Sequence, residues 1–456
     1  MSVFFTILLG LLGLSIVIFF HELGHFFMAK LVGIPVLEFS IGMGPALVSF
    51  THKDIRYKIG VFPVGGYCKL KGEDSYRNAI IEKKETAVFE KNDFLGANPF
   101  KKIAISLGGP LFNLILAFLI FVLIQAIGYT TSTFPNRIIL TNDFVDSPRY
   151  PALDAGLKTG DVIAKIDNAD TPSFSDIQKA VAQSAEKQLA LTVVRGTETL
   201  YISATPMLEK ASASGKLGIY PWIDPIVSKV KKASAAYVAG IEPGDKILSC
   251  NDREIRNTQD IYAYFESQRP EKCSVLVDRN GKQLSIVVIP IYAAENDTDP
   301  LGISWVTMKI RIQSPGFFAA LRNGFDEVAS VLSDTYKGII SLFSGVNLLS
   351  AIAGPARITW TVGKLTTEGI AEEGVSSGLL STLNFLGFLS IALFVMNLLP
   401  IPVLDGGWIL LFLIEIVRRK PVSLKAILRY QQIGLVVVFL LFGLSIFSDI
   451  LFFIKG

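Results

Sequence analysis

The sequence predicts a multi-pass α-helical membrane protein with about four transmembrane helices, two inserted α/β domains and a small membrane-associated β-hairpin. Of the 456 residues, 50% are hydrophobic and 18% are charged, and the mean hydropathy is +0.47. Ordinary globular chains carry about 25% charged residues, so the low charge content indicates a membrane. The apolar residues gather in four long runs, and the polar middle of the chain contains an internal repeat.

The first apolar run, Val3–Phe20, is long enough to cross a bilayer, which takes about 20 residues. No Lys or Arg precedes it and no small-residue cleavage site follows, so we interpret it as a retained helix and not as a signal peptide. Trp408–Val417 is apolar but too short to cross, and we expect it at the membrane boundary or in a re-entrant position. The other predicted spans are Ile103–Gly128, Leu379–Leu399 and Ile433–Ile454.

Basic residues concentrate in two connecting segments, residues 30–102 and residues 418–429. The positive-inside rule predicts that both segments are cytoplasmic, with both termini and the polar region from about Thr130 to Gly378 outside. The formal net charge of +3 is too small to suggest a nucleic-acid partner. The expected surroundings are therefore membrane lipid.

These patterns divide the chain into eight segments. Residues 318–343 carry apolar side chains every three or four positions, which predicts an amphipathic helix of about 30 residues that packs either on the membrane surface or on neighbouring domains. The expected segments are a first span in 1–32, a cytoplasmic β region in 33–102, a second span in 103–128, repeated domains in 129–208 and 209–293, the amphipathic region in 294–378, a third span with a short following helix in 379–420 and a fourth span in 421–456.

The internal repeat has an offset of 84 residues. Ala-Gly-Leu-Lys-Thr-Gly-Asp-Val-Ile at 155–163 corresponds to Ala-Gly-Ile-Glu-Pro-Gly-Asp-Lys-Ile at 239–247, and Arg195 corresponds to Arg279. This run resembles the turn and strand of bacterial PDZ domains, which bind extended peptides by strand addition; glycines that only permit tight turns are the alternative. Each copy predicts a strand, a helix and a strand pair, with strands Val162–Ile166 and Lys246–Ser249 and helices Phe174–Gln183 and Thr258–Ser267.

The three cysteines are too few for a disulfide scaffold and none forms a CxxC pair, so a cysteine zinc site is not expected. Cys250 and Cys273 either form a disulfide or remain two buried free thiols, and the sequence leaves both open. Cys68 lies in the predicted β region, far in sequence from the other two cysteines.

The strongest chemical signal is His21-Glu22-Leu23-Gly24-His25, directly after the first apolar run. Spacing of i, i+4 puts both imidazoles on one helix face, where they can bind Zn²⁺ at about 2.0–2.1 Å. Glu22 then projects beside the open coordination position, where it can take a proton from the attacking water. Ionisable groups at membrane depth are costly unless they are paired or ligated, so a purely structural role is disfavoured.

A catalytic zinc site usually has three protein ligands. Asp405 is the best candidate for the third, because it follows the third predicted span on the same side of the membrane as His25. Pro400 and Pro402 interrupt the helix there, which is tolerated where the backbone faces protein or a water-lined cavity. The alternative for Asp405 is a helix N-cap before Gly406.

The two motifs together, HELGH and Asn397-x-x-Pro-x-Pro-x-Leu-Asp405-Gly, closely resemble the site-2 protease family of intramembrane zinc metalloproteases. The two PDZ-like copies point to its bacterial, RseP-like branch, and the resemblance covers nearly the whole chain. Met43 and the run Ala356-Arg357-Ile358 depart from the family pattern. Further matching pieces are 39–45, 63–67, Gly108-Gly109-Pro110-Leu111-Phe112-Asn113 and Gly354-Pro355.

The resemblance implies that His21, His25 and Asp405 bind Zn²⁺, that Glu22 is the general base and that Asn397 lies near the substrate. It also implies that the apolar Ile59–Leu70 segment is the family's membrane-associated β-hairpin, which would hold an unwound substrate by strand addition. There, Gly65 and Gly66 either let a substrate backbone approach closely or form a plain turn.

The function implied is hydrolysis of a peptide bond within the transmembrane segment of a single-span protein, after an upstream site-1 protease has shortened it outside. An anti-sigma factor and a signal-peptide remnant both fit as substrate. A membrane-tethered PDZ sensor with a structural zinc site is the main alternative, but zinc binding alone would not need Glu22. A zinc transporter is disfavoured because the spans carry few polar residues along a pathway, namely Asn113, Gln125, Asn384 and Asn397.

Overall fold

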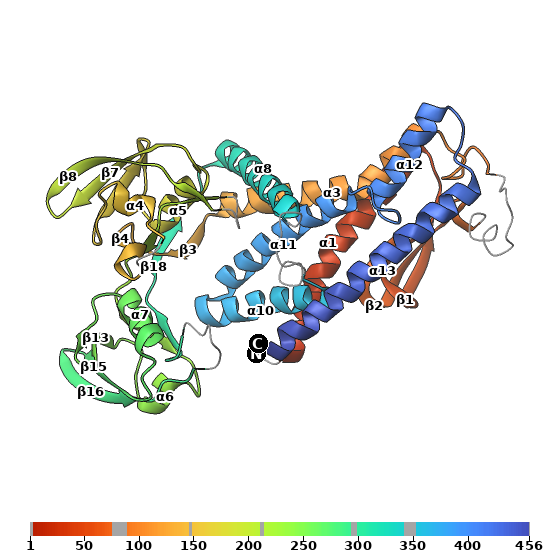
Figure 1. The fold of residues 1–456 in the computed structure, drawn as a ribbon. Helices are drawn as coiled ribbons and strands as arrows, with labels where there is room; N and C mark the ends of the chain where they lie inside the picture. Colours follow the sequence, from red (N-terminus) through yellow and green to blue (C-terminus); the bar gives the residue numbers. More distant parts are fainter. Residues whose placement is uncertain are drawn as a thin grey trace. The chain divides into compact units, whose positions relative to one another are not determined.

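The fold consists of two compact units, each of which is described by itself. A computed structural model describes residues 3–74, 89–145, 148–209, 214–292, 299–341 and 353–455. The first unit comprises Met1–Tyr129 and Ile312–Gly456, and the second is Thr130–Arg311. Long helices dominate the first unit and short strands dominate the second (Figure 1).

Four described helices of the first unit are long and apolar enough to cross a membrane, as the sequence predicts. The first of them continues twelve residues past Phe20, so HELGH lies inside this helix, within the segment 1–32 expected for the first span. The four are α1 (Val3–Val32), α3 (Pro99–Ile127), α11 (Val375–Asn397) and α13 (Leu424–Lys455).

Three further helices lie in the described part of this unit: α8 (Phe317–Ser341), α10 (Pro355–Glu373) and α12 (Asp405–Arg418). The predicted amphipathic helix corresponds to α8, and its predicted last turn, with Phe343, lies outside the described residues. The separate helix α10 is not anticipated by the apolar spacing. It packs beside α1 and α11, where Val362 shares a buried core with Val17 and Leu386.

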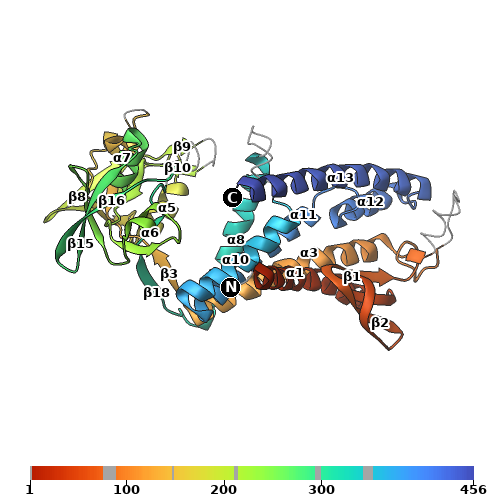
Figure 2. The ribbon, with the colours of Figure 1, turned by 90° about the horizontal axis from the view of Figure 1, so that it is seen from below.

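Helices α1 and α3 run side by side, as Figures 1 and 2 both show. Their backbones touch at Gly24 and Gly108: a Cβ atom on Gly108 would lie 2.5 Å from the Gly24 carbonyl oxygen. Small residues allow such close approach between membrane helices. This contact places the HELGH turn of α1 directly against the Gly-Gly-Pro segment of α3.

Strands β1 (Val36–His52) and β2 (Ile55–Leu70) form an antiparallel ribbon that bends back on itself, so that Phe39 has partners in both halves of β2. The turn is Lys53-Asp54, with φ of 47° and 61°, the left-handed pair that two-residue hairpins require. Gly66 lies inside β2 opposite Ile41. Residues 57–59 of β2 pair with residues 39–41 in the same direction, whereas residues 66–68 pair with them in the opposite direction, so β2 reverses between Ile59 and Gly66. Both interpretations of Gly65 and Gly66 therefore stay open.

The second unit contains two four-stranded sheets with the same order, β6-β5-β7-β8 and β14-β13-β15-β16. In each, the helix between the second and third strands begins with a capping box, closed by Asp176 in α5 and Asp260 in α7. The first copy has β5 (Val162–Ile166), β6 (Ala169–Asp170), α5 (Phe174–Ala182), β7 (Leu189–Arg195) and β8 (Glu198–Ala204). The second has β13 (Lys246–Cys250), β14 (Arg253–Glu254), α7 (Thr258–Gln268), β15 (Cys273–Arg279) and β16 (Lys282–Val288).

Shorter elements complete this unit as antiparallel pairs of strands and short helices. The pairs are β3 (Tyr129–Thr133) with β18 (Met308–Ile312), β4 (Ile138–Leu140) with β11 (Ile219–Pro221), β9 (Met207–Glu209) with β10 (Ser214–Lys216), and β12 (Val227–Val230) with β17 (Ile303–Trp305). The short helices are η1 (Thr141–Asp143), α4 (Pro151–Asp154) and α6 (Ala235–Ala239).

The repeated sequence produces the same ion pair twice. Arg195 donates to both carboxylate oxygens of Asp161 and to the Gly156 carbonyl, and Arg279 does the same to Asp245 and Gly240. Each pair ties the glycine turn to the third strand of its sheet. This explains why Gly, Asp and Arg recur together at the offset of 84 residues.

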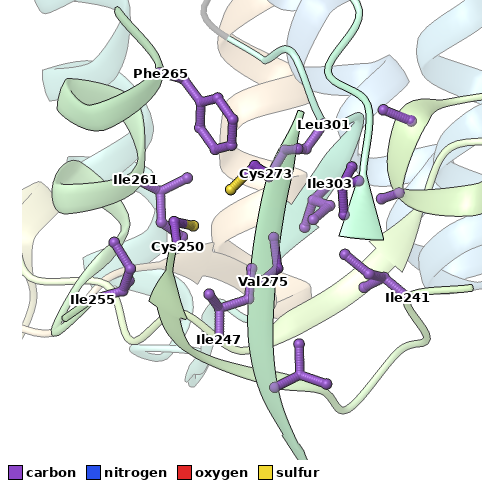
Figure 3. Close-up of a cluster of buried hydrophobic side chains, with 14 of the residues drawn as sticks. Ile241, Ile247, Cys250, Ile255, Ile261, Phe265, Cys273, Val275, Leu301 and Ile303 are labelled. Atoms are coloured by element: carbon purple, nitrogen blue, oxygen red, sulfur yellow. The ribbon is translucent and has the colours of Figure 1, made fainter. Parts of the chain in front are cut away.

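Cys250 and Cys273 lie in the buried core of the second copy, next to Phe265 and Val275 (Figure 3). Both are free thiols. Their sulfur atoms face the same core from neighbouring strands, and this agrees with the interpretation of two buried thiols.

The Asp245–Arg279 pair predicts a pH-dependent stability of the second copy. Burial alone would raise the pKa of Asp245, but hydrogen bonds from Arg279 and from the Glu242 N–H lower it below its usual value. A lowered folded-state pKa stabilises the fold above the unfolded-state pKa of about 3.9, and this stabilisation is lost as the pH falls through the folded-state value. We expect Arg279→Met to accelerate hydrogen exchange in β13 and β15 strongly at pH 6 and much less near pH 3.

The matched control for this prediction is Glu242→Gln. It removes an exposed carboxylate that also contacts Arg279, at 3.0 Å, but keeps the backbone donor. Equal acceleration by Arg279→Met at both pH values, measured by mass spectrometry and corrected for intrinsic exchange, would contradict the prediction.

Candidate metal centre

The centre is built on one turn of α1. His21 and His25 lie four residues apart, so both imidazoles project from the same face, with ring centroids 4.8 Å apart and planes at 84°. Their Nε2 atoms are 3.2 Å apart. Asp405 approaches from the start of α12, with Oδ2 3.3 Å from His21 Nε2 and Oδ1 3.5 Å from His25 Nε2.

These three side chains can hold a metal ion. Tetrahedral Zn²⁺ with ligand distances of about 2.0–2.2 Å separates neighbouring ligand atoms by about 3.3–3.6 Å. The two Nε2 atoms, 3.2 Å apart, are spaced like two neighbouring ligands of such an ion, and each also lies 3.3–3.5 Å from one of the two carboxylate oxygens of Asp405. Two imidazoles and a carboxylate are also the donor types that Zn²⁺ accepts, so the residues fit this ion.

The ring nitrogens that face away from Asp405 are both occupied by groups of α3. His25 Nδ1 lies 2.8 Å from the Ile105 carbonyl oxygen, and His21 Nδ1 lies 3.3 Å from the Asn113 side-chain amide. Metal-binding histidines are held in place by such partners of the other ring nitrogen. Helix α3 therefore orients both imidazoles.

Asp405 is presented by a tight connection between α11 and α12. It is the first residue of α12, whose N-cap is Leu404, so the N-cap interpretation of Asp405 is wrong. Val403 has φ of 85°, a strained value for a β-branched residue of the kind that clusters at functional sites. Gly406 follows, because a Cβ there would overlap the Leu398 carbonyl.

Glu22 lies on the side of the histidine pair that faces the β1–β2 ribbon. The backbone of Cys68 hydrogen-bonds to its carboxylate, and a Cβ on Gly66 would lie 3.0 Å from Glu22 Cγ. A cavity of about 980 Å³ opens at this point. Its lining includes Glu22 and Val403 together with residues of the ribbon such as Glu38, Lys58 and Tyr67.

The ribbon side of the cavity carries a charged cluster. Tyr67 donates a hydrogen bond to Glu38, and Lys58 lies 2.9 Å from the Tyr67 hydroxyl. Burial opposes ionisation of Glu38, but the Tyr67 hydroxyl and the Lys58 and Arg56 charges lower its pKa. Glu38 is therefore an ionised carboxylate that accepts hydrogen bonds from the ribbon.

The structure brings together His21, Glu22, His25, Asp405 and Gly66. Gly65 packs against Met43, with φ of 86°, and not against Glu22. Asn397 is the last residue of α11 and is half-buried, eight residues before Asp405.

Sequence reasoning missed Gly109 and the ion pair of Lys102 with Glu415. A Cβ on Gly109 would lie 2.7 Å from His21 Cε1 and closer still to His25 Nε2. Lys102 Nζ is 2.5 Å from Glu415 Oε2, and its side chain is only 2% exposed. A Glu inside the apolar 408–417 segment was the available signal for the pair.

The Lys102–Glu415 pair joins α3 to α12, the helix that begins at Asp405. Removing one partner of a buried pair costs about 3–5 kcal/mol, because the other charge is left buried alone. We therefore expect Lys102→Met to lower the free energy of unfolding by about that amount in mild detergent, and Lys102→Met with Glu415→Leu to recover most of it.

The control for this prediction is Lys364→Met, which breaks an exposed pair with Glu368 and should change stability by less than about 1 kcal/mol. Equal losses in the single and double variants at Lys102 and Glu415 would show that packing, and not charge, explains the effect.

Comparison with known proteins identifies the family. A family model described as Peptidase family M50 matches residues 9–441. Relatives named "Putative zinc metalloprotease" from Treponema pallidum and Borreliella burgdorferi are 34% and 31% identical, covering 98% and 97% of this chain and 99% and 98% of theirs. A relative named Protease RseP, from Yersinia pestis, is 27% identical over 98% of this chain and 99% of its own.

The match extends over the spans, the HELGH turn and Asp405, and the relatives are covered almost completely. The name of the first two relatives agrees with the donor set described above. The chain belongs to peptidase family M50 and is a zinc metalloprotease.

Proposed function

We propose that this protein hydrolyses a peptide bond within the transmembrane segment of a single-span substrate that has already been shortened outside the membrane. The observation that carries the proposal is the position of Glu22, at the end of the apolar run of α1, beside three convergent ligands and open to a cavity. Family membership supports intramembrane proteolysis in general.

His21, His25 and Asp405 are the proposed zinc ligands. When bound, Zn²⁺ polarises the scissile carbonyl and lowers the pKa of water towards about 7. Glu22 accepts the proton of the attacking water and passes it to the leaving amine nitrogen. The Cys68 backbone hydrogen bond holds the Glu22 carboxylate in place for both transfers.

A transmembrane helix hides its peptide bonds in its own hydrogen bonds, so it must unwind before it can be cut. The β1–β2 ribbon lies directly beside Glu22, and strand addition to it would hold an unwound segment. Gly66 lets this part of the ribbon pack directly against the Glu22 side chain, and we assign Gly66, Gly65 and Asn397 to the substrate path.

The two four-stranded repeats are the proposed PDZ-like domains, in residues 129–208 and 209–293. On the orientation given by the basic segments, they and both termini lie outside the inner membrane, and the metal centre lies near the cytoplasmic face. There they would exclude bulky external domains, so that only shortened proteins reach the centre. An anti-sigma factor after site-1 cleavage and a signal-peptide remnant are the two substrate classes that fit.

The test is cleavage in membranes of a tagged single-span protein, with and without its external domain, with the new terminus mapped by mass spectrometry. We expect cleavage inside the span, and only of the shortened form. If the zinc-loaded enzyme cuts none of several shortened substrates, a membrane-tethered peptide-binding sensor becomes the better account.

A further inference from the structure

Asn113 is a fully buried polar residue in the middle of the membrane helix α3. Its side-chain Nδ2 lies 3.3 Å from His21 Nδ1. Its Oδ1 is buried and has no hydrogen-bond partner among the residues that the structure describes. A buried, half-satisfied amide is costly in an apolar surrounding, so its retention at this position requires a reason.

The chemistry of the neighbouring imidazole supplies the reason. The Nε2 atoms of His21 and His25 both face Asp405, so a metal bound there engages Nε2 and leaves the hydrogen on Nδ1. His25 Nδ1 then donates to the Ile105 carbonyl oxygen. The corresponding hydrogen on His21 Nδ1 points at Asn113, and an amide NH₂ group cannot accept it.

The two ends of an asparagine amide have nearly the same shape, and their assignment follows from the hydrogen bonds they make. Rotation of the Asn113 amide by half a turn brings Oδ1 to the position 3.3 Å from His21 Nδ1. In that orientation the imidazole N–H has an acceptor. Each orientation gives a partner to only one end of the amide. When His21 binds metal through Nε2, its Nδ1 hydrogen needs an acceptor, and only the rotated amide provides one.

The backbone around Asn113 is well placed for this role. Its carbonyl oxygen accepts a hydrogen bond of 2.7 Å from Ser390 Oγ of α11, which ties this turn of α3 to its neighbour. Pro110 lies between Ile105 and Asn113 in the same helix. One helix thus presents an acceptor to each of the two histidines, from positions four residues before and four residues after Gly109.

We infer that Asn113 is a positioning residue of the metal centre: its side-chain oxygen accepts the His21 Nδ1 hydrogen and so fixes the ring and the tautomer that leaves Nε2 free for zinc. This inference rests on the proposed ligand set. Asn113 touches neither the metal nor the substrate in this role.

The first experiment measures zinc affinity in detergent by competition with a graded chelator. We expect Asn113→Leu, which has similar size and no acceptor, to weaken zinc binding by about 10–100-fold. Asn113→Asp supplies a carboxylate acceptor and should bind zinc at least as tightly as the wild type. Asn384→Leu makes the same replacement at an exposed position of α11 and is the matched control.

The second experiment reads the histidine tautomers directly by NMR. The chain has only three histidines, so ¹⁵N-histidine labelling gives three imidazole spin systems, and His52→Asn identifies the exposed one. In the zinc-loaded protein we expect both remaining rings to carry hydrogen on Nδ1. In the Asn113→Leu variant we expect the His21 signals to show a second tautomer or ring exchange, with the His25 signals unchanged.

The outcomes separate this inference from the proposed ligand set. If His21→Ala and His25→Ala retain wild-type zinc affinity, the ligand set itself fails. If they lose zinc but Asn113→Leu binds it within twofold of the wild type, or Asn113→Asp binds it as weakly as Asn113→Leu, the positioning role is overturned. A wild-type zinc form with His21 bound through Nδ1 overturns it as well.

Discussion

Replacement of Glu22 by Gln is expected to abolish hydrolysis while zinc stays bound. Gln keeps the size of the side chain and can still hydrogen-bond to the Cys68 backbone, but it cannot take a proton from water. General-base catalysis contributes about 10²–10⁴-fold to a rate, so the turnover of a cleavable single-span substrate should fall by at least that factor. Zinc content by mass spectrometry should remain equal to that of the wild type.

The control for Glu22→Gln is Glu368→Gln, the same change at an exposed position of α10, which should leave turnover unchanged. A residual rate above about a tenth of the wild type would be inconsistent with the general-base role, for which a loss of at least 10²-fold is the rule. Loss of zinc together with activity would instead place Glu22 in the ligand set.

Gly109→Ala should remove zinc from the centre. The new methyl group would lie 2.7 Å from His21 Cε1 and closer to His25 Nε2, well inside the carbon contact distance of about 3.5 Å. Moving α3 away from α1 would break the close backbone contact of Gly24 with Gly108 one residue earlier. The imidazoles must therefore move apart, and zinc affinity should fall by at least about 100-fold.

Gly443→Ala in α13 is the matched variant, because nothing lies within 4 Å of the Cβ it would add. Alanine favours a helix by up to about 1 kcal/mol over glycine, so neither change should unfold its helix. Equal zinc content in the two variants, measured after exhaustive dialysis, would refute the placement of Gly109 against the two rings.

The part of the centre that lies within one helix is predictable from sequence. HELGH needs only helical spacing to bring two imidazoles together, and the structure places them so. The segment 1–32 expected for the first span also contains the whole of α1, although the apolar run stops before His21.

Other features depend on tertiary structure and left only weak signals. The turn at Lys53-Asp54 contains no glycine, so its composition gives no signal of a chain reversal. Lys102 and Glu415 are 313 residues apart, so nothing in their local sequence indicates that they meet. Glycines at 108 and 109 mark a close approach only when the partner helix is known.

The backbone contact between Gly24 and Gly108 limits which parts of the metal centre can be changed by substitution. Because main chain meets main chain there, no side-chain rearrangement alters the spacing between the HELGH turn and the groups of α3 that face it. The far wall of the cavity is formed by side chains of the ribbon, which can be exchanged one at a time. On the proposed function, we expect substitutions there to change which peptides are accepted while the hydrolytic chemistry stays the same.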